Sequence, residues 1–125
     1  MEEKSGKRLI ITISGKRRYI HIWKSVIKAL DYPYYICLRI AKDKKSMAIL
    51  PCKEDSELSV KVPDEFLFTT YKASLRICSK SFCDRLIYDN KWDYDTSYNI
   101  EGKLRDDKRA VVFYLDDAKP IPKEL

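Results

Sequence analysis

Residues 9–30 read LIITISGKRRYIHIWKSVIKAL, and this stretch decides the fold. An apolar run at Leu9–Ile13 leads into the turn Ser14-Gly15-Lys16, and apolar residues resume at Tyr19–Ile22. Two such runs joined by a short turn predict a β-hairpin, with Gly15 supplying a permissive turn backbone. Ser25–Leu30 then has apolar side chains at helical spacing and ends before Pro33, so we expect a short helix.

A second hairpin is predicted after this helix. Tyr34–Ile40 and Met47–Leu50 are rich in β-branched and apolar residues, and they flank the charged turn Lys42-Asp43-Lys44-Lys45. The first half of the chain therefore has the order ribbon, helix, hairpin.

The second half repeats this order. Its predicted elements are a strand at Leu75–Cys78, a helix at Lys80–Ile87 and a hairpin of Tyr98–Leu104 with Ala110–Leu115. Lys24-Ser25 matches Lys80-Ser81 at an offset of 56, and Asp43-Lys44-Lys45 matches Asp107-Lys108-Arg109 at an offset of 64. Two blocks that keep their order favour an internal duplication. We expect a first repeat at 1–52, a linker at 53–70, a second, degenerate repeat at 71–115 and an irregular tail at 116–125, in one compact unit.

Composition limits the class of protein. The chain has 125 residues with 45% apolar content, which fits one small α+β domain, mostly β, and excludes a multi-domain enzyme. No stretch approaches the ~18 apolar residues that span a bilayer, and the acidic start is unlike a signal peptide, so we expect a cytoplasmic protein without membrane contact.

The positive charge lies in one half of the chain. Residues 1–62 carry 14 Lys+Arg and 7 Asp+Glu, whereas residues 63–125 carry 11 and 12. The densest clusters, Lys7-Arg8 and Lys16-Arg17-Arg18, flank the first apolar run. Arginine contacts phosphate or a guanine edge bidentately, so this basic ribbon predicts a nucleic-acid contact. The alternative is a solvated hairpin whose charges only give solubility.

Residues 13–30 carry a resemblance to a known family. The strand, the turn with a glycine, the basic segment and the short helix ending in Ala29-Leu30 resemble the AbrB/MazE family of swapped-hairpin DNA-binding domains over about 40 residues. The chain departs from the family at Trp23, where Pro is usual, and at Asp31, where Gly is usual.

This resemblance implies a fold and a function. In the family, two chains interleave their hairpins into one barrel, so two copies in one chain would form a swapped-hairpin-like pseudo-dimeric barrel, either as a monomer or paired into a homodimer. The residues implied to contact DNA are Lys7, Arg8, Lys16, Arg17 and Arg18, with Lys24 and Lys28 at the periphery.

Four further patterns in the sequence carry weaker signals. Asp64 and Glu101-Gly102-Lys103 resemble scattered nuclease carboxylates, but the pattern is unspecific. His21 has no nearby nucleophile motif.

The four cysteines lack zinc spacing and are interpreted as reduced, structural thiols, with a metal or redox role as the alternative. They are Cys37, Cys52, Cys78 and Cys83. Tyrosines and tryptophans that cluster after each helix favour core packing over base stacking; they are Tyr32, Tyr34, Tyr35, Trp92, Tyr94 and Tyr98.

The sequence therefore predicts a small, non-enzymatic DNA-binding protein, a transcriptional regulator, without catalytic residues, metal or cofactor. Compactness and high charge suit a second hypothesis equally well: a protein-interaction module on the same scaffold, such as an antitoxin or a phage-borne inhibitor. A metal-dependent nuclease is the remote third hypothesis.

Overall fold

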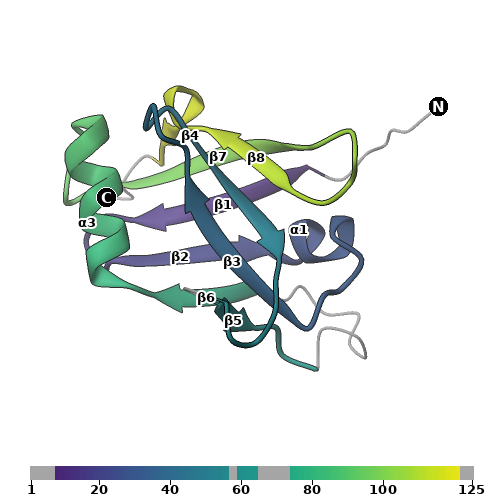
Figure 1. Cartoon of the computed structure of the whole chain (residues 1–125). Helices are drawn as coiled ribbons and strands as arrows, with labels where there is room; N and C mark the ends of the chain where they lie inside the picture. Colours follow the sequence, from purple (N-terminus) through teal and green to yellow (C-terminus); the bar gives the residue numbers. More distant parts are fainter. Residues whose placement is uncertain (1–7, 57–58, 65–73, 122–125) are drawn as a thin grey trace.

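A computed structural model describes residues 8–56, 59–64 and 74–121 of the chain. These residues fold mostly into β-strands, and they include two α-helices (Figure 1). The strands form one nearly closed antiparallel barrel, in the order β5-β3-β4-β8-β7-β1-β2-β6, with β9 paired to β7. The mostly-β, α+β class expected from the sequence is thereby confirmed.

The first hairpin forms where the sequence predicts it. Strand β1 spans Leu9–Ser14 and β2 spans Tyr19–Trp23. They pair antiparallel, with Ile11 opposite Ile22 and Ile13 opposite Ile20. All four isoleucines are fully buried, because alternation along each strand points them into the barrel.

Gly15 has a different role from the predicted one. Its φ is not positive, and the left-handed residue of the turn is Arg18, with φ 56°. A Cβ on Gly15 would lie 2.5 Å from the carbonyl oxygen of Thr96, to which the Gly15 N–H donates at 3.0 Å. The glycine is needed here because another segment of backbone packs directly against it.

The remaining elements of the first half follow in the expected order. Helix α1 spans Lys24–Ala29, and the hairpin of β3 and β4 spans Tyr35–Ile40 and Ser46–Pro51. A strand that was not expected, β5 at Ser59–Lys61, pairs with β3. It lies inside the range predicted as a linker, of which 57–58 and 65–70 are outside the described residues.

The second half also follows its predicted order. Strand β6 spans Ser74–Cys78, α3 spans Lys80–Asn90, β7 spans Ser97–Leu104 and β8 spans Val111–Tyr114. Ser79 caps α3 by accepting a hydrogen bond from the Phe82 N–H, and Lys91 ends it in the left-handed conformation. The expectation of an irregular tail is wrong for its first residues: Leu115–Asp117 forms the 3-10 turn η1, and Lys119–Pro120 forms β9 against β7.

The two long hairpins share their register and their loop geometry. Leu38 lies opposite Ile49 in the first, and Gly102 lies opposite Phe113 in the second, each 64 positions later. In the loops, Lys45 N–H donates to the Asp43 carboxylate, and Arg109 N–H donates to the Asp107 carboxylate. The loops also place Lys44 and Lys108 at φ 62° and 60°.

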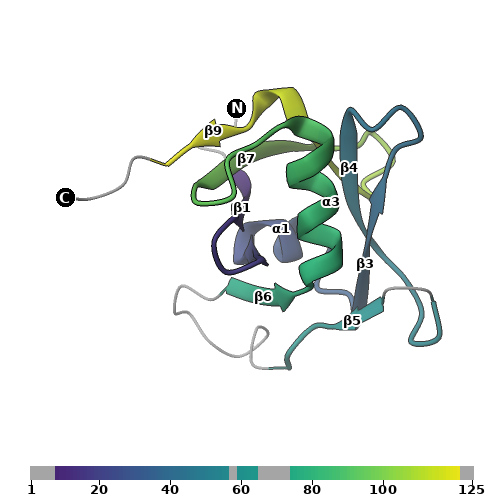
Figure 2. The same cartoon turned by 90° about the vertical axis from the view of Figure 1, so that its left-hand side faces the viewer.

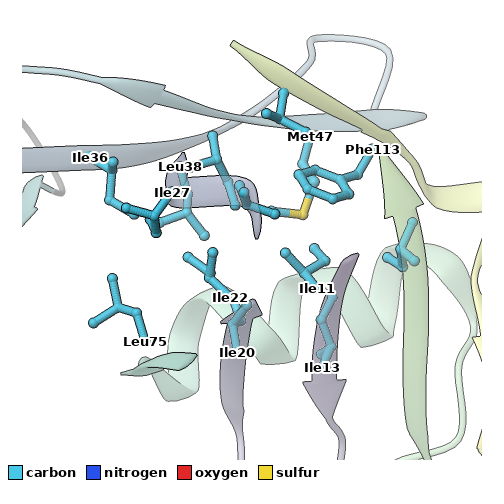
Figure 3. Packing of buried hydrophobic residues seen from close by; sticks show 14 of the residues in the cluster. Ile11, Ile13, Ile20, Ile22, Ile27, Ile36, Leu38, Met47, Leu75 and Phe113 are labelled. Carbon is cyan, nitrogen blue, oxygen red and sulfur yellow. The ribbon is translucent and has the colours of Figure 1, made fainter. Parts of the chain in front are cut away.

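One core fills the barrel between its two helices. Figure 1 shows α3 at one end of the barrel and α1 at the other. Figure 2, a view along the barrel, shows the two helices one behind the other, with β1 and β7 to one side and β3 and β4 to the other. In Figure 3, residues from β3, β4 and β8 face residues from β1, β2 and β6 across the core, with Ile27 of α1 between them. The labelled members are Ile11, Ile13, Ile20, Ile22, Ile27, Ile36, Leu38, Met47, Leu75 and Phe113.

Candidate nucleic-acid interface

The turn between β1 and β2 presents two exposed cations. Arg17 N–H donates to the Ser14 hydroxyl at 3.1 Å, and Arg18 N–H donates to the Ser14 carbonyl at 3.0 Å. These bonds close the turn tightly and leave the side chains of Lys16 and Arg17 in solvent. Both are therefore placed to meet an anionic partner.

Arg18, the third predicted cation of this turn, folds back onto the protein. Its Nε donates to the Asp84 carboxylate of α3, with the two side chains 23% and 37% exposed. Its guanidinium carbon also lies 4.6 Å from the centre of the Tyr94 ring. Arg18 thus fastens the turn to α3, and these contacts occupy its charge.

The other predicted cations lie at the opposite end of the hairpin. Arg8 precedes β1 and pairs with Glu101 of β7 at 3.2 Å, in a solvent-exposed contact. The Ser25 hydroxyl of α1 donates to the Arg8 carbonyl at 2.7 Å, which places the start of α1 beside Arg8. Lys24 and Lys28, both on α1, therefore lie at this end of the hairpin. The six residues of β1 separate the two ends by about 20 Å. Lys7 lies outside the described residues.

The outer face of the sheet joins these two ends. Because Ile20 and Ile22 point inward, Tyr19, His21 and Trp23 point outward along β2. Arg76 of β6 lies directly opposite His21. The same alternation that predicts the buried isoleucines also predicts an outward aromatic series, but the partner strand β6 is 55 residues away, so the sequence did not indicate this cluster.

The side chains of this face are held by contacts among themselves. The guanidinium of Arg76 lies 4.5 Å from the centre of the Tyr19 ring, and its Nε donates to Nε2 of His21 at 3.1 Å. The ring centres of Tyr19 and His21 lie 4.8 Å apart. Partial burial and the Arg76 charge lower the pKa of His21, so the imidazole is neutral at pH 7 with Nε2 as an acceptor.

The aromatic residues after each helix divide into two groups. Trp92 stacks on the buried Tyr98 at 4.8 Å, and Tyr32 packs against the core, as predicted. Tyr34 and Tyr94 are exposed, at 76% and 43%, so the core-packing prediction is wrong for these two.

The four cysteines are free thiols. Cys37 and Cys83 are buried, whereas Cys78 is exposed although it lies in an apolar run. Burial raises the pKa of the Cys83 thiol to about 11, and burial together with the neighbouring Cys37 raises the pKa of Cys52 to about 11. Thiols with such pKa values are poor nucleophiles at neutral pH.

The carboxylates of the nuclease hypothesis are not brought together. Asp64 follows β5, whereas Glu101 lies on β7 and pairs with Arg8. Strands β3, β4 and β8 separate β5 from β7 in the sheet order. Among residues 8–56, 59–64 and 74–121, no group of three His, Cys, Asp or Glu side chains is placed to hold a metal ion.

Comparisons with known proteins assign no family. No protein-family model, no curated protein and no solved structure matches the chain. Within the described part of the chain, neither helix has the length and hydropathy needed to cross a membrane.

Proposed function

We propose that this protein is a small, non-enzymatic DNA-binding protein of the cytoplasm, with the role of a transcriptional regulator. One observation carries the proposal: the β1–β2 hairpin holds exposed cations at both ends, Lys16 and Arg17 in its turn and Arg8 before β1, on either side of an aromatic face. Cations at the two ends of one hairpin can contact separate phosphates of the same nucleic acid. Each of these contacts adds salt-dependent affinity.

We propose further that the barrel is a single-chain pseudo-dimer built from two repeats. The two repeats would match β1 with β5, β2 with β6, β3 with β7 and β4 with β8. When each strand is exchanged with its match, the order of strands around the barrel stays the same but runs in the opposite direction. This is the behaviour of a two-fold axis through the barrel wall. Ala48 lies opposite Val112, 64 positions later, so this axis crosses the β4–β8 pair at these residues.

Strand β5 takes the place of β1 in the second repeat. Ile11 of β1 lies opposite Ile100 of β7, and Val60 of β5 lies opposite Ile36 of β3, the residue 64 positions before Ile100. On this proposal the second repeat begins near residue 59, whereas the sequence alone predicts a start at residue 71. In the sequence, residues 62–73 between β5 and β6 contain one lysine and no arginine, so the second half has no basic cluster that corresponds to Lys16-Arg17-Arg18.

Fluorescence anisotropy with labelled duplex DNA at several salt concentrations tests the DNA-binding proposal. The double variant Lys16→Glu/Arg17→Glu should weaken binding at least tenfold and reduce its salt dependence, because two phosphate contacts are lost. Lys42→Glu/Lys45→Glu, with the same change of charge in the β3–β4 loop, is the matched control and should retain most of the affinity. Absent or salt-insensitive binding by the wild type rejects the proposal.

A second candidate, the protein-interaction module, is favoured by the exposed aromatic side chains at the α3 end of the barrel. Tyr88 is 77% exposed and lines a surface depression with Trp92 and Tyr94. Aromatic residues are enriched at protein interfaces. Co-purification from a nuclease-treated lysate separates the candidates: a stoichiometric protein partner lost in Tyr88→Ala favours the interaction module.

A further inference from the structure

We propose that the outer face of β2 and β6 binds unpaired bases of a single nucleic-acid strand by stacking. The inference deepens the proposed function, on which it rests, by naming the form of nucleic acid. The face consists of Tyr19, His21 and Trp23 on β2 with Arg76 on β6, and it is called the stacking face below.

Among the described residues, no helix covers the stacking face. The helices α1 and α3 lie at opposite ends of the barrel and leave the outer sides of β1, β2 and β6 uncovered by either (Figures 1 and 2). Trp23 is 40% exposed and Arg76 is also exposed, whereas Tyr19 and His21 are half-buried. Large aromatic groups left in solvent on one sheet face, beside cations, are typical of a binding surface.

Trp23 is held across the sheet. Its indole N–H donates to the Thr12 hydroxyl of β1 at 3.3 Å, and this hydroxyl donates to the Asn99 side-chain oxygen of β7 at 2.6 Å. The indole therefore loses little conformational freedom when a base packs on it, which lowers the cost of binding.

Tyr19 and Arg76 form a second platform. The guanidinium over the Tyr19 ring is a planar cation on an aromatic face, and the bond to His21 uses one of its five N–H donors. A stacked guanidinium offers both a surface for a base and donors for a phosphate. Tyr19 and Trp23 are four residues apart on one strand, or about 13 Å, which gives room for two or three bases.

These groups favour an unpaired strand over a duplex. Ring faces stack on the faces of bases, which are covered by neighbouring base pairs in a duplex, whereas duplex readout needs donors aimed at base edges. Arg18, which could supply such donors, is engaged with Asp84 and Tyr94. Lys16 and Arg17 at one end complement the charge of the strand's phosphates, and Arg8 at the other end can do so by exchanging its solvent-exposed ion pair with Glu101 for a phosphate.

Labelled oligodeoxythymidine, oligouridine and a duplex of equal length test this inference by anisotropy, together with tryptophan fluorescence. We expect the single strand to bind more tightly than the duplex and to quench Trp23. Trp23→Ala and Tyr19→Ala should each weaken single-strand binding about tenfold, within the range for loss of one stacked base. Trp23→Phe should keep the affinity but lose the quenching, and Tyr88→Ala, on α3, should change neither.

The outcomes separate the inference from the function on which it rests. A single strand that binds no better than the duplex, with affinity unchanged in Trp23→Ala, overturns the stacking face, while sensitivity to Lys16→Glu/Arg17→Glu would still support DNA binding. Binding of no nucleic acid overturns both. Tighter binding of oligodeoxythymidine or of oligouridine, each sensitive to Trp23→Ala, supports the inference and identifies the strand as DNA or RNA.

Discussion

Individual residues of the β1–β2 turn divide into those that build it and those that it presents. Gly15 and Arg18 build it, through backbone packing against Thr96 and through contacts with Asp84 and Tyr94. Lys16 and Arg17 project into solvent. The run of basic residues therefore predicts which residue types lie here, but it does not distinguish the two roles, because the partners of Gly15 and Arg18 are more than 65 residues away.

Gly15→Ala should destabilise the protein by about 2 to 3 kcal/mol, because its Cβ would overlap with the carbonyl oxygens of Thr96, Asp93 and Tyr94, at 2.5 to 2.9 Å. Urea denaturation followed by circular dichroism measures this change. Lys16→Ala, in the neighbouring exposed position, should stay within about 0.5 kcal/mol of the wild type. Equal stability of the two variants would contradict the close approach of the two backbones.

Arg18→Ala should lower the free energy of unfolding by about 1 to 2 kcal/mol, since it removes a charge-assisted hydrogen bond and a cation–π contact. A double-mutant cycle with Asp84→Asn should give a favourable coupling energy between the two side chains. Arg17→Ala should leave stability unchanged. If Arg18→Ala instead left stability intact and abolished DNA binding, Arg18 would be a nucleic-acid contact.

At the scale of elements, local signals predicted most of the fold. The alternation of β1 and β2 and the charged loops of both long hairpins are properties of neighbouring residues, so their strands could be found from the sequence. The strands β5 and β9 could not, because three and two residues carry too little pattern and their pairing depends on β3 and β7. The stacking face was missed for the same reason, since β6 supplies Arg76 from far along the chain.

The matched loops of the two long hairpins allow a test of the duplication. Lys44 and Lys108 both have left-handed backbones, which cost a residue with a Cβ more than they cost glycine. Lys44→Gly and Lys108→Gly should therefore each stabilise the protein by about 0.5 to 1 kcal/mol, measured by thermal or urea unfolding. Stabilisation by one substitution and destabilisation by the other would show that the two loops are not equivalent.

At the scale of the whole molecule, the barrel contains one core that draws on both halves of the chain. Ile11 and Ile22 come from the first half and Ile100 and Phe113 from the second, and all are fully buried. A single chain thus supplies the whole core. Under the proposed duplication, each repeat is too small to bury a core alone, and the two repeats share this one.

The protein should therefore be a monomer of 14.8 kDa in the absence of nucleic acid. Size-exclusion chromatography with light scattering at several protein concentrations measures this mass. A dimer whose dissociation on dilution is accompanied by unfolding would show that the barrel needs a second chain and would contradict the pseudo-dimer.

The most direct test of the account is a map of backbone amide shifts by NMR during titration with a short oligonucleotide. We expect the changes to gather at Lys16–Trp23 and at β6, with little change in the β3–β4 loop. Changes confined to the β3–β4–β5 side of the barrel, or to the exposed part of α3, would contradict it and move the binding surface elsewhere.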